Sequence, residues 1–267
     1  MEQQAFTPAP GTLSVMMPVF NEDRTLAIIL KHVLAREEVG EVIVVDDGST
    51  DKTWEILTDV AARDSRLHIF RQAQNLGKGA ALRLAITHLT LPFALVQDAD
   101  LEYDPRDYPR LLQPLAEGRT DVIYGVRGFA GHSSFSYWFV VGNKLVTWCT
   151  NVLFDCYISD METGYKVLRS HLWQQLQLSG NRFEIEPDIT ARILRLGYRI
   201  HEVPISYYAR SREEGKKLTW RDGLTAIFTL VRLRLSSDRR LFGLASSDYH
   251  RKRQDELITQ HPLMPHK

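Results

Sequence analysis

Short apolar runs alternate with segments of helical apolar spacing along the first half of the chain. The apolar runs predict buried strands at residues 13–20, 41–45, 67–70, 93–96 and 121–124. Between them, apolar residues recur at intervals of three and four, which predicts helices at residues 26–34, 51–62, 79–88 and 106–117. Strand–helix alternation with short links is typical of a parallel sheet. We therefore expect an α/β fold with a mostly parallel central sheet flanked by helices.

The alternation stops after residue 124, where a loop containing Gly and Ser begins. Residues 137–154 are strongly apolar, with Asn143 and Lys144 as interruptions. This pattern is equally consistent with packing on the sheet and with contact to a membrane surface. Beyond it we predict a short strand at 167–168, a helix at 188–196 and a last strand at 199–208, in which Pro204 favours an edge position.

Composition limits the possible settings of the protein. The 267 residues carry 33 basic and 33 acidic side chains, so the net charge favours no particular partner. The cysteines Cys149 and Cys156 are expected on one helix and match neither a disulfide framework nor a metal motif, which fits a reducing compartment. The sequence contains no signal peptide and no apolar run of membrane-spanning length. We therefore expect a cytoplasmic protein.

A basic segment follows the last predicted strand. In residues 210–240 basic residues outnumber acidic ones, and an apolar stretch at 224–231 lies between arginines. This composition is typical of a helix on an anionic membrane surface, or of a charged helix docked on its own domain. We divide the chain into a flexible N-terminus (1–11), an α/β domain (12–209), a basic loop with an amphipathic membrane-surface helix (210–245) and a polar tail (246–267).

Polar turns follow four of the predicted strands, after residues 20, 45, 70 and 96. Open α/β sheets bind ligands at the carboxyl ends of their strands, so we expect these turns to lie together at a binding site. There Asp47 offers a carboxylate for a base or ribose, Lys78 offers a cation between two glycines, and a carboxylate cluster begins at Asp98. A diphosphate-linked nucleotide requires all three. The P-loop and dinucleotide-binding glycine patterns are absent.

Two groups of carboxylates carry the candidate chemistry. Asp98, Asp100 and Glu102 alternate after the strand at 93–96, so their side chains share one face if the chain stays extended. Such a cluster repels itself unless a cation neutralises it, and its oxygen ligands suit Mg²⁺ or Mn²⁺. A solvated acidic turn with Asp104 as a helix cap is the simpler alternative. Asp160 and Glu162 form a second pair on a polar turn, for which the simpler alternative is a capped loop with Gly164 in a left-handed conformation.

Four motifs occur in a characteristic order. They are PVFNE (18–22), VVDDGSTD (44–51), NLGKG (75–79) and DAD (98–100). In this order they resemble the inverting GT-A glycosyltransferases of family 2. The segments 98–102, 160–166, 212–217 and 220–223 further resemble its branch of dolichyl- or polyprenyl-phosphate sugar synthases, the dolichol-phosphate mannosyltransferase type. The resemblance covers residues 12–235 and implies a GT-A nucleotide-diphospho-sugar transferase fold, with 12–209 as the catalytic domain.

The resemblance also implies roles for individual residues. The nucleotide-sugar would be bound by Pro18, Glu22, Asp47, Gly48, Ser49, Lys78, Asp98 and Ala99. Mg²⁺ or Mn²⁺ would be held, directly or through water, by Asp98, Asp100 and Glu102. Arg127 would bind a phosphate of the acceptor or donor, and Arg212 and Lys217 would close over the acceptor side on a mobile loop. The candidates for catalysis are Asp100, Arg127, Asp160 and Glu162.

The implied reaction displaces a nucleoside diphosphate from the anomeric carbon of a hexose, with GDP-mannose and UDP-glucose equally consistent as donors. A phosphate monoester, whose second pKa is about 6, is largely dianionic at neutral pH and can attack without a protein base. A sugar hydroxyl would need a base, for which Asp160 or Glu162 are the candidates. We expect a polyprenyl or dolichyl phosphate acceptor. Transfer to a sugar hydroxyl in cell-surface glycan synthesis is the alternative, and a non-catalytic nucleotide-sugar-binding regulator is a remote one.

A lipid acceptor predicts a peripheral protein on the cytoplasmic face of a membrane. We expect the membrane contact to come from the helix within 210–245, with residues 137–154 as a second candidate. The basic residues accompany apolar stretches rather than an aromatic-lined groove, so no nucleic-acid partner is expected.

Overall fold

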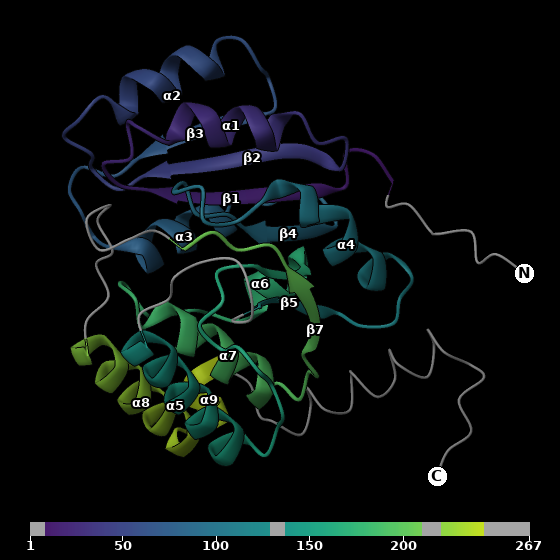
Figure 1. Cartoon of the computed structure of the whole chain (residues 1–267), viewed down its shortest axis with the longest axis vertical. Coiled ribbons are helices and arrows are strands. Elements are labelled where there is room, and N and C mark those ends of the chain that lie inside the picture. The colour runs from purple at the N-terminus through teal and green to yellow at the C-terminus, as the bar shows by residue number, and fades with distance from the viewer. Residues whose placement is uncertain (1–8, 129–136, 210–219, 243–267) are drawn as a thin grey trace, which may run out of the picture.

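A central sheet of seven strands organises the protein (Figure 1). The computed structural model describes residues 9–128, 137–209 and 220–242. The strand order is β3-β2-β1-β4-β6-β5-β7. The strands are β1 (Leu13–Val19), β2 (Val39–Asp46), β3 (Leu67–Arg71), β4 (Phe93–Val96), β5 (Val122–Arg127), β6 (Lys166–Arg169) and β7 (His201–Ile205).

The first four predicted strands form one parallel part of this sheet. β1 pairs in parallel with both β2 and β4, and β2 pairs in parallel with β3. β5 and β7 are also parallel, and β7 lies at the edge of the sheet, as Pro204 predicts. Between these two parts lies β6, which runs antiparallel to β4 and to β5. The prediction of a mostly parallel sheet is therefore confirmed, with one antiparallel strand added.

Successive residues of a strand point to opposite faces of the sheet, so both faces carry apolar side chains. Helices cover each face. Val15 and Met17 pack in a core under helices α1 (Leu26–Leu34), α2 (Thr53–Ala61) and α4 (Tyr108–Ala116). Met16 packs in the opposite core, whose helices are α3 (Lys78–Ile86), α5 (Tyr137–Phe154), α6 (Ser170–Gln175), α7 (Ile185–Arg195), α8 (Trp220–Leu235) and α9 (Asp238–Phe242). Both cores are built from buried aliphatic and aromatic side chains, so the sheet is covered on each side as a parallel sheet requires.

Polar side chains mark the starts of two helices, as predicted. Asp104 accepts a hydrogen bond from the backbone N of Arg106 at 2.9 Å, at the start of the short 3-10 helix η1 (Pro105–Asp107) that precedes α4. Asp51 accepts one from the backbone N of Thr53 at 3.0 Å, at the start of α2. Each carboxylate satisfies a donor that the first turn of a helix leaves unpaired.

The cysteine prediction is wrong in one respect. Helix α5 ends at Phe154, so Cys149 lies on the helix and Cys156 lies beyond its end. Both cysteines are free thiols.

None of the helices in the described part of the chain is long and apolar enough to cross a membrane. The division of the chain into four segments remains a prediction, since residues 1–8, 210–219 and 243–267 lie outside the described residues.

Candidate functional site

The turns after β1, β2 and β3 lie together at one edge of the sheet, as predicted. Ser49 Oγ, from the turn after β2, accepts a hydrogen bond from the backbone N of Asn21 at 2.9 Å, in the turn after β1. The Asp47 carboxylate accepts from the backbone N of Leu76 and of Gly77, each at 2.8 Å, in the turn after β3. These contacts join segments about thirty residues apart and fix the loop that carries Lys78.

These contacts give Asp47 a structural role beside its predicted contact with the nucleoside. Both of its oxygens hold backbone groups of the neighbouring turn, and the side chain is almost entirely buried. Gly48 adopts φ +74°, and a Cβ there would lie 2.8 Å from the backbone carbon of Gln74. Asp47, Gly48 and Ser49 therefore build the turn, and their contact with a nucleoside remains a prediction.

A cleft of about 640 Å³ opens beside these turns. Its walls include most of the residues that the sequence indicated: Pro18, Glu22, Asp47, Lys78, Asp98, Ala99, Asp100, Glu102, Arg127 and Glu162. They also include residues from later elements, among them Tyr103, Phe139, Gly164, Arg182, Glu186, Tyr207, Asp222 and Thr225. Of the remaining candidates, Gly48 and Ser49 form the turn after β2, Asp160 lies behind Arg127, and Arg212 and Lys217 fall outside the described residues.

The acidic segment after β4 turns, so the extended conformation on which a shared face depended is not adopted. Ala99 and Asp100 form a turn, and Leu101 adopts φ +63°. Asp100 Oδ1 accepts a hydrogen bond from the backbone N of Glu102 at 3.2 Å. Glu102 Oε2 accepts one from the Tyr207 hydroxyl at 2.6 Å. The three carboxylates therefore have different partners and do not lie along one extended face.

The first carboxylate of this segment is tied to a chain of buried charges. Lys78 Nζ lies 2.8 Å from Asp98 Oδ1 and 3.0 Å from Glu186 Oε1. The other oxygen of Glu186 pairs with Lys166, which is fully buried on β6. Burial alone would raise the pKa of Glu186, but the two lysines outweigh it and lower that pKa below its usual value. The chain of alternating charges keeps Glu186 ionised at the base of the cleft.

Burial has the larger effect on Asp98, whose pKa is raised although Lys78 acts to lower it. The pKa of Lys78 lies well above its usual value, because its two carboxylate partners outweigh the opposing effect of burial. Lys78 is therefore a permanent cation beside Asp98. A second positive charge near Asp98, from a metal ion, would favour the ionised carboxylate further.

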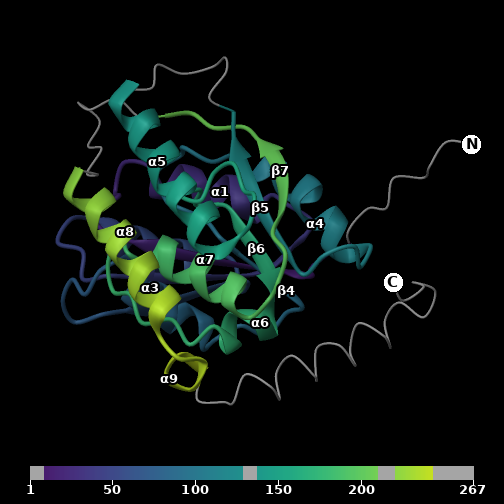
Figure 2. The ribbon, with the colours of Figure 1, turned by 90° about the horizontal axis from the view of Figure 1, so that it is seen from below.

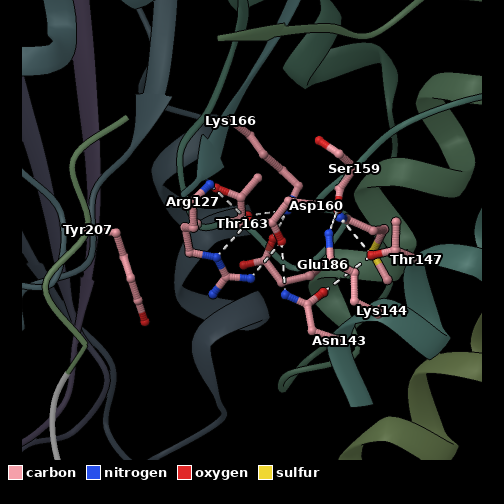
Figure 3. Close-up of polar contacts among 12 residues, drawn as sticks. Arg127, Asn143, Lys144, Thr147, Ser159, Asp160, Thr163, Lys166, Glu186 and Tyr207 are labelled. Carbon is pink, nitrogen blue, oxygen red and sulfur yellow. Dashed lines mark hydrogen bonds and ion pairs between the residues drawn. The ribbon is translucent and has the colours of Figure 1, made fainter. Parts of the chain in front are cut away.

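Arg127 and Asp160 form a buried ion pair at the wall of the cleft (Figure 3). Arg127 Nε and Nη2 donate to the two Asp160 oxygens, each at 2.7 Å. Asn143 Nδ2 and the backbone N of Arg127 also donate to Asp160, at 3.1 and 3.2 Å. Burial acts to raise the pKa of Asp160, but Arg127 and these donors lower it below its usual value. Asp160 is thus a poor proton acceptor, and its geometry fits a positioning role toward Arg127 rather than that of a base.

Glu162 is the other predicted base, and its environment differs. Burial and the negative charge of Glu186 raise the pKa of Glu162 to about 7, against the opposing effects of Lys166 and Arg127. A carboxyl group with a pKa near the working pH is suited to accept a proton. The structure therefore distinguishes two carboxyl groups that the sequence presented as equivalent.

Gly164 is required by close packing and not by a left-handed backbone, so the alternative of a loop with a left-handed Gly164 is wrong. Its φ lies outside the left-handed region. A Cβ at this position would lie 2.7 Å from Asp98 Oδ2 and 3.0 Å from the Tyr103 ring. The backbone N of Gly164 donates to the Tyr103 hydroxyl at 2.7 Å. The turn before β6 therefore approaches Asp98 as closely as a glycine allows.

The residues of the cleft partly fit a divalent cation. In the described part of the chain, no group of three or more His, Cys, Asp or Glu side chains is arranged to hold a metal ion, so the predicted three-carboxylate cluster is not assembled. Asp98 and Asp100 nevertheless line the same cleft with hard oxygen donors. Mg²⁺ is commonly bound by one or two carboxylates together with substrate phosphates, and that donor set fits Asp98 and Asp100. Glu102 is held by Tyr207, so its role as a ligand stays a prediction.

Sequence reasoning missed Glu186, Lys166, Tyr103 and Tyr207. Each lies far along the chain from its partner, as with Glu186 and Lys78 or Tyr207 and Glu102. One signal was available, since Lys166 directly precedes the apolar residues of β6 and a lysine that is buried there requires a charged partner. The sequence does not say which carboxylate supplies it.

Comparison with known proteins identifies the family. The family described as "Glycosyl transferase family 2" matches residues 14–174, and the chain belongs to this family. Glycosyltransferase AglJ of Haloferax volcanii is 28% identical over 204 residues, covering 76% of this chain and 65% of the relative. Dodecaprenyl-phosphate galacturonate synthase of Rhizobium johnstonii is 27% identical over 213 residues, covering 76% and 61%. The chain thus spans less than two thirds of the length of either relative.

The fold is also found in solved structures. One is glucosyl-3-phosphoglycerate synthase from Mycobacterium tuberculosis, in complex with Mn²⁺, uridine-diphosphate-glucose and phosphoglyceric acid. It aligns with a TM-score of 0.64 at 21% identity, covering 85% of this chain and 81% of that chain. At this identity the likeness concerns the fold, and it confirms the predicted GT-A architecture.

Proposed function

We propose that this chain is a metal-dependent, inverting glycosyltransferase that moves a hexose from a nucleotide-diphospho-sugar of the GDP-mannose or UDP-glucose type to a polyprenyl or dolichyl phosphate. The observation that carries the proposal is a single cleft that combines carboxylates suited to a divalent cation, Asp98 and Asp100, with the cations Lys78 and Arg127. Membership of family 2 supports sugar transfer. The name of the Rhizobium relative supports a polyprenyl phosphate acceptor.

On the donor side, Pro18, Glu22 and Asp47 would hold the nucleoside, at the wall of the cleft formed by the turns after β1 and β2. Asp98 and Asp100 would hold Mg²⁺ or Mn²⁺, and the bound ion would neutralise charge on the departing diphosphate. Lys78 is fixed by Asp98 and Glu186, so its positive charge is already in position and needs no reorganisation during the reaction.

On the acceptor side, Arg127 would position the phosphate, since arginine suits phosphate oxygens geometrically. Its guanidinium is held by Asp160 and lies over the Tyr207 ring, with 5.3 Å between the guanidinium carbon and the ring centroid. Arg212 and Lys217, outside the described residues, remain predicted contributors to the same task. A guanidinium held in place would orient the acceptor phosphate toward the anomeric carbon, and such orientation of bound reactants lowers the reaction barrier.

In the proposed step, an oxygen of the acceptor phosphate attacks the anomeric carbon of the hexose. The bond from that carbon to the diphosphate oxygen breaks, and its electron pair leaves with the nucleoside diphosphate. A single displacement of this kind inverts the anomeric configuration. The phosphate, with a second pKa of about 6, is already deprotonated near neutral pH, so no protein base takes part.

A hydroxyl acceptor is the second candidate, and one observation favours it. Glu162 lines the cleft and has a pKa of about 7, as a general base for a sugar hydroxyl would require. The two candidates therefore differ in whether Glu162 is needed.

Replacing Glu162 with Gln separates them. For a phosphate acceptor we expect a loss of less than about tenfold, because removal of a true general base costs roughly 10²–10⁴-fold. The measurement is kcat of wild type and Glu162→Gln with polyprenyl phosphate, followed across pH. Both proteins should show a rate that rises near the phosphate pKa of about 6.

A hydroxyl acceptor gives a different pattern. The wild-type rate would rise as Glu162 loses its proton near pH 7, and Glu162→Gln would lack that rise. If Glu162→Gln is as inactive as Asp100→Asn while donor binding is intact, the phosphate-acceptor proposal is wrong.

We also propose that residues 12–209 are the catalytic domain and that the protein acts as a peripheral protein on the cytoplasmic face of a membrane. A lipid acceptor supports this location, because the phosphate group of such a lipid lies at the membrane surface.

A further inference from the structure

Helix α5 buries mainly polar side chains and exposes mainly apolar ones. Its buried residues are Asn143, Val146, Thr147 and Thr150, three of them polar. They are satisfied locally: Asn143 donates to Asp160, Thr147 Oγ1 accepts from the backbone N of Met161 at 3.2 Å, and Thr150 donates to the Val146 carbonyl at 3.0 Å. A helix on the surface of a water-soluble domain normally has the reverse arrangement.

The exposed side of α5 is an apolar stripe. Trp138, Val141, Leu145, Trp148 and Val152 recur at intervals of three and four, so they share one face of the helix. Trp138 is 76% exposed and Trp148 is 61% exposed. The only charged residue of α5 is Lys144, which is also exposed and donates to the Ser159 carbonyl at 3.1 Å. Contiguous apolar surface of this kind usually marks an interaction site.

Helix α8 lies beside α5 and adds a second stripe (Figure 2). Leu224, Phe228, Val231 and Leu235 are exposed at helical spacing, Phe228 at 68% and Leu235 at 81%. The other side of α8 is anchored by buried Leu230 and Leu233. Arg234 Nε donates to the Leu153 carbonyl at 2.7 Å, which ties the end of α8 to the end of α5. We call the two stripes together the α5–α8 face.

We propose that the α5–α8 face is a membrane-binding surface that lies in the interfacial layer of an anionic lipid bilayer. Tryptophan and tyrosine prefer that layer, and α5 supplies Tyr137, Trp138 and Trp148. The charges fit as well: the described side chains of α5 and α8 include three cations, Lys144, Arg232 and Arg234, and one carboxylate, Asp222. Anionic headgroups attract such basic residues. A second copy of the chain would instead bring the same basic residues face to face.

The position of this face connects it with the cleft. Phe139 of α5 and Asp222 and Thr225 of α8 line the cleft, so the two helices that would contact lipid also form one of its walls. Binding to the bilayer would then bring the cleft next to lipid headgroups. This consequence rests on the proposed function, whereas the membrane contact itself does not.

The test uses the full chain and vesicles without any sugar donor or polyprenyl phosphate. We expect the wild type to float with vesicles of mixed phosphatidylcholine and phosphatidylglycerol. The double variant Trp148→Glu, Phe228→Glu should lose vesicle binding by roughly tenfold or more, because each change removes a large apolar side chain from the lipid contact. Ile28→Glu is the matched control, since Ile28 is an exposed apolar residue on α1, on the opposite side of the sheet. It should bind as the wild type does.

A second measurement needs no acidic variant. Brominated lipids should quench the tryptophan fluorescence of the wild type, and the conservative Trp148→Phe should quench less while binding equally. Equal vesicle binding by the double variant and the wild type would overturn the proposal. An absence of vesicle binding by the wild type would also overturn it. So would a wild type that does not bind vesicles but forms a dimer in sedimentation that the double variant abolishes. Because no sugar transfer is measured, failure of the proposed function would leave this result unaffected.

Discussion

Replacing Asp100 with Asn is expected to abolish metal-dependent turnover, with a loss of about 10²–10³-fold or more, the magnitude seen when one electrostatic contact to developing charge is removed. Asn retains the oxygen that accepts from the backbone N of Glu102, so the turn after β4 should keep its shape. The substitution removes the negative charge with which Asp100 would hold Mg²⁺ or Mn²⁺. The measurement is turnover of the donor by wild type and variant over a range of Mg²⁺ and Mn²⁺ concentrations.

Asp104→Asn is the matched control for this prediction. Asp104 lies in the same acidic segment but caps η1 and pairs with Arg106 instead of lining the cleft. Its replacement should cost at most about 1 kcal/mol of stability, as for other helix caps, and leave turnover nearly unchanged. Wild-type turnover by Asp100→Asn, or an equally inactive Asp104→Asn with a normal fold, would contradict the metal-binding role of Asp100.

Replacing Asp160 with Asn should lower the free energy of unfolding by about 3–5 kcal/mol, because it leaves the buried guanidinium of Arg127 without its counter-charge. Only 4% of Arg127 is exposed, and two of its nitrogens donate to Asp160 at 2.7 Å. Urea unfolding monitored by circular dichroism measures the difference. The comparison is Asp59→Asn, whose ion pair with Arg63 is largely exposed and should be worth less than about 1 kcal/mol.

The pH dependence of the free energy of unfolding provides a second test of the Arg127–Asp160 ion pair. The pKa of Asp160 is lowered in the folded protein, so its contribution to stability is present above the usual Asp pKa and is lost as the pH falls through the folded-state value. Wild type and Asp160→Asn should therefore differ at neutral pH and converge in acid. Equal stabilities at neutral pH, or losses no greater than for Asp59→Asn, would contradict the account of this ion pair.

The part of the fold that could be predicted from the sequence is the part where neighbouring elements pair with one another. Strands β1 to β4 and their intervening helices have clear periodicity, and parallel pairing follows from strand–helix alternation. The direction of β6 could not be predicted in the same way. Its four residues pair with β4 and β5, and the long excursion through α5 decides from which end the chain returns.

The candidate site could also be predicted only where its residues belong to local motifs. Lys78, Asp98 and Asp100 could be predicted because each belongs to a local motif that ends a strand of the parallel half. The opposite pKa shifts of Asp160 and Glu162 could not be predicted, because they depend on partners elsewhere in the chain. These partners are Arg127 and Asn143 for Asp160, and Glu186 and Lys166 for Glu162. The turn at Leu101 escaped prediction because a left-handed leucine has no sequence signal.

Helix α5 shows why an apolar pattern alone left two alternatives open. The sequence showed Asn143 and Lys144 as interruptions in an apolar segment and did not indicate which side of the helix faces the core. In the structure Asn143 points inward because Asp160 and Thr147 supply polar partners for it. Only those tertiary contacts reveal that the apolar side of α5 is the one left outside.

The most direct test of the central claim is a search for the lipid-linked product. Purified protein with Mg²⁺ or Mn²⁺ and undecaprenyl or dolichyl phosphate in detergent would be given GDP-mannose, UDP-glucose, UDP-galactose or UDP-GlcNAc in turn, and the lipids analysed by mass spectrometry. We predict a polyprenyl-phosphate hexose with one of these donors, and none with Asp100→Asn. Steady hydrolysis of one donor without any lipid product would contradict the phosphate acceptor and leave Glu162 as the candidate base for a hydroxyl.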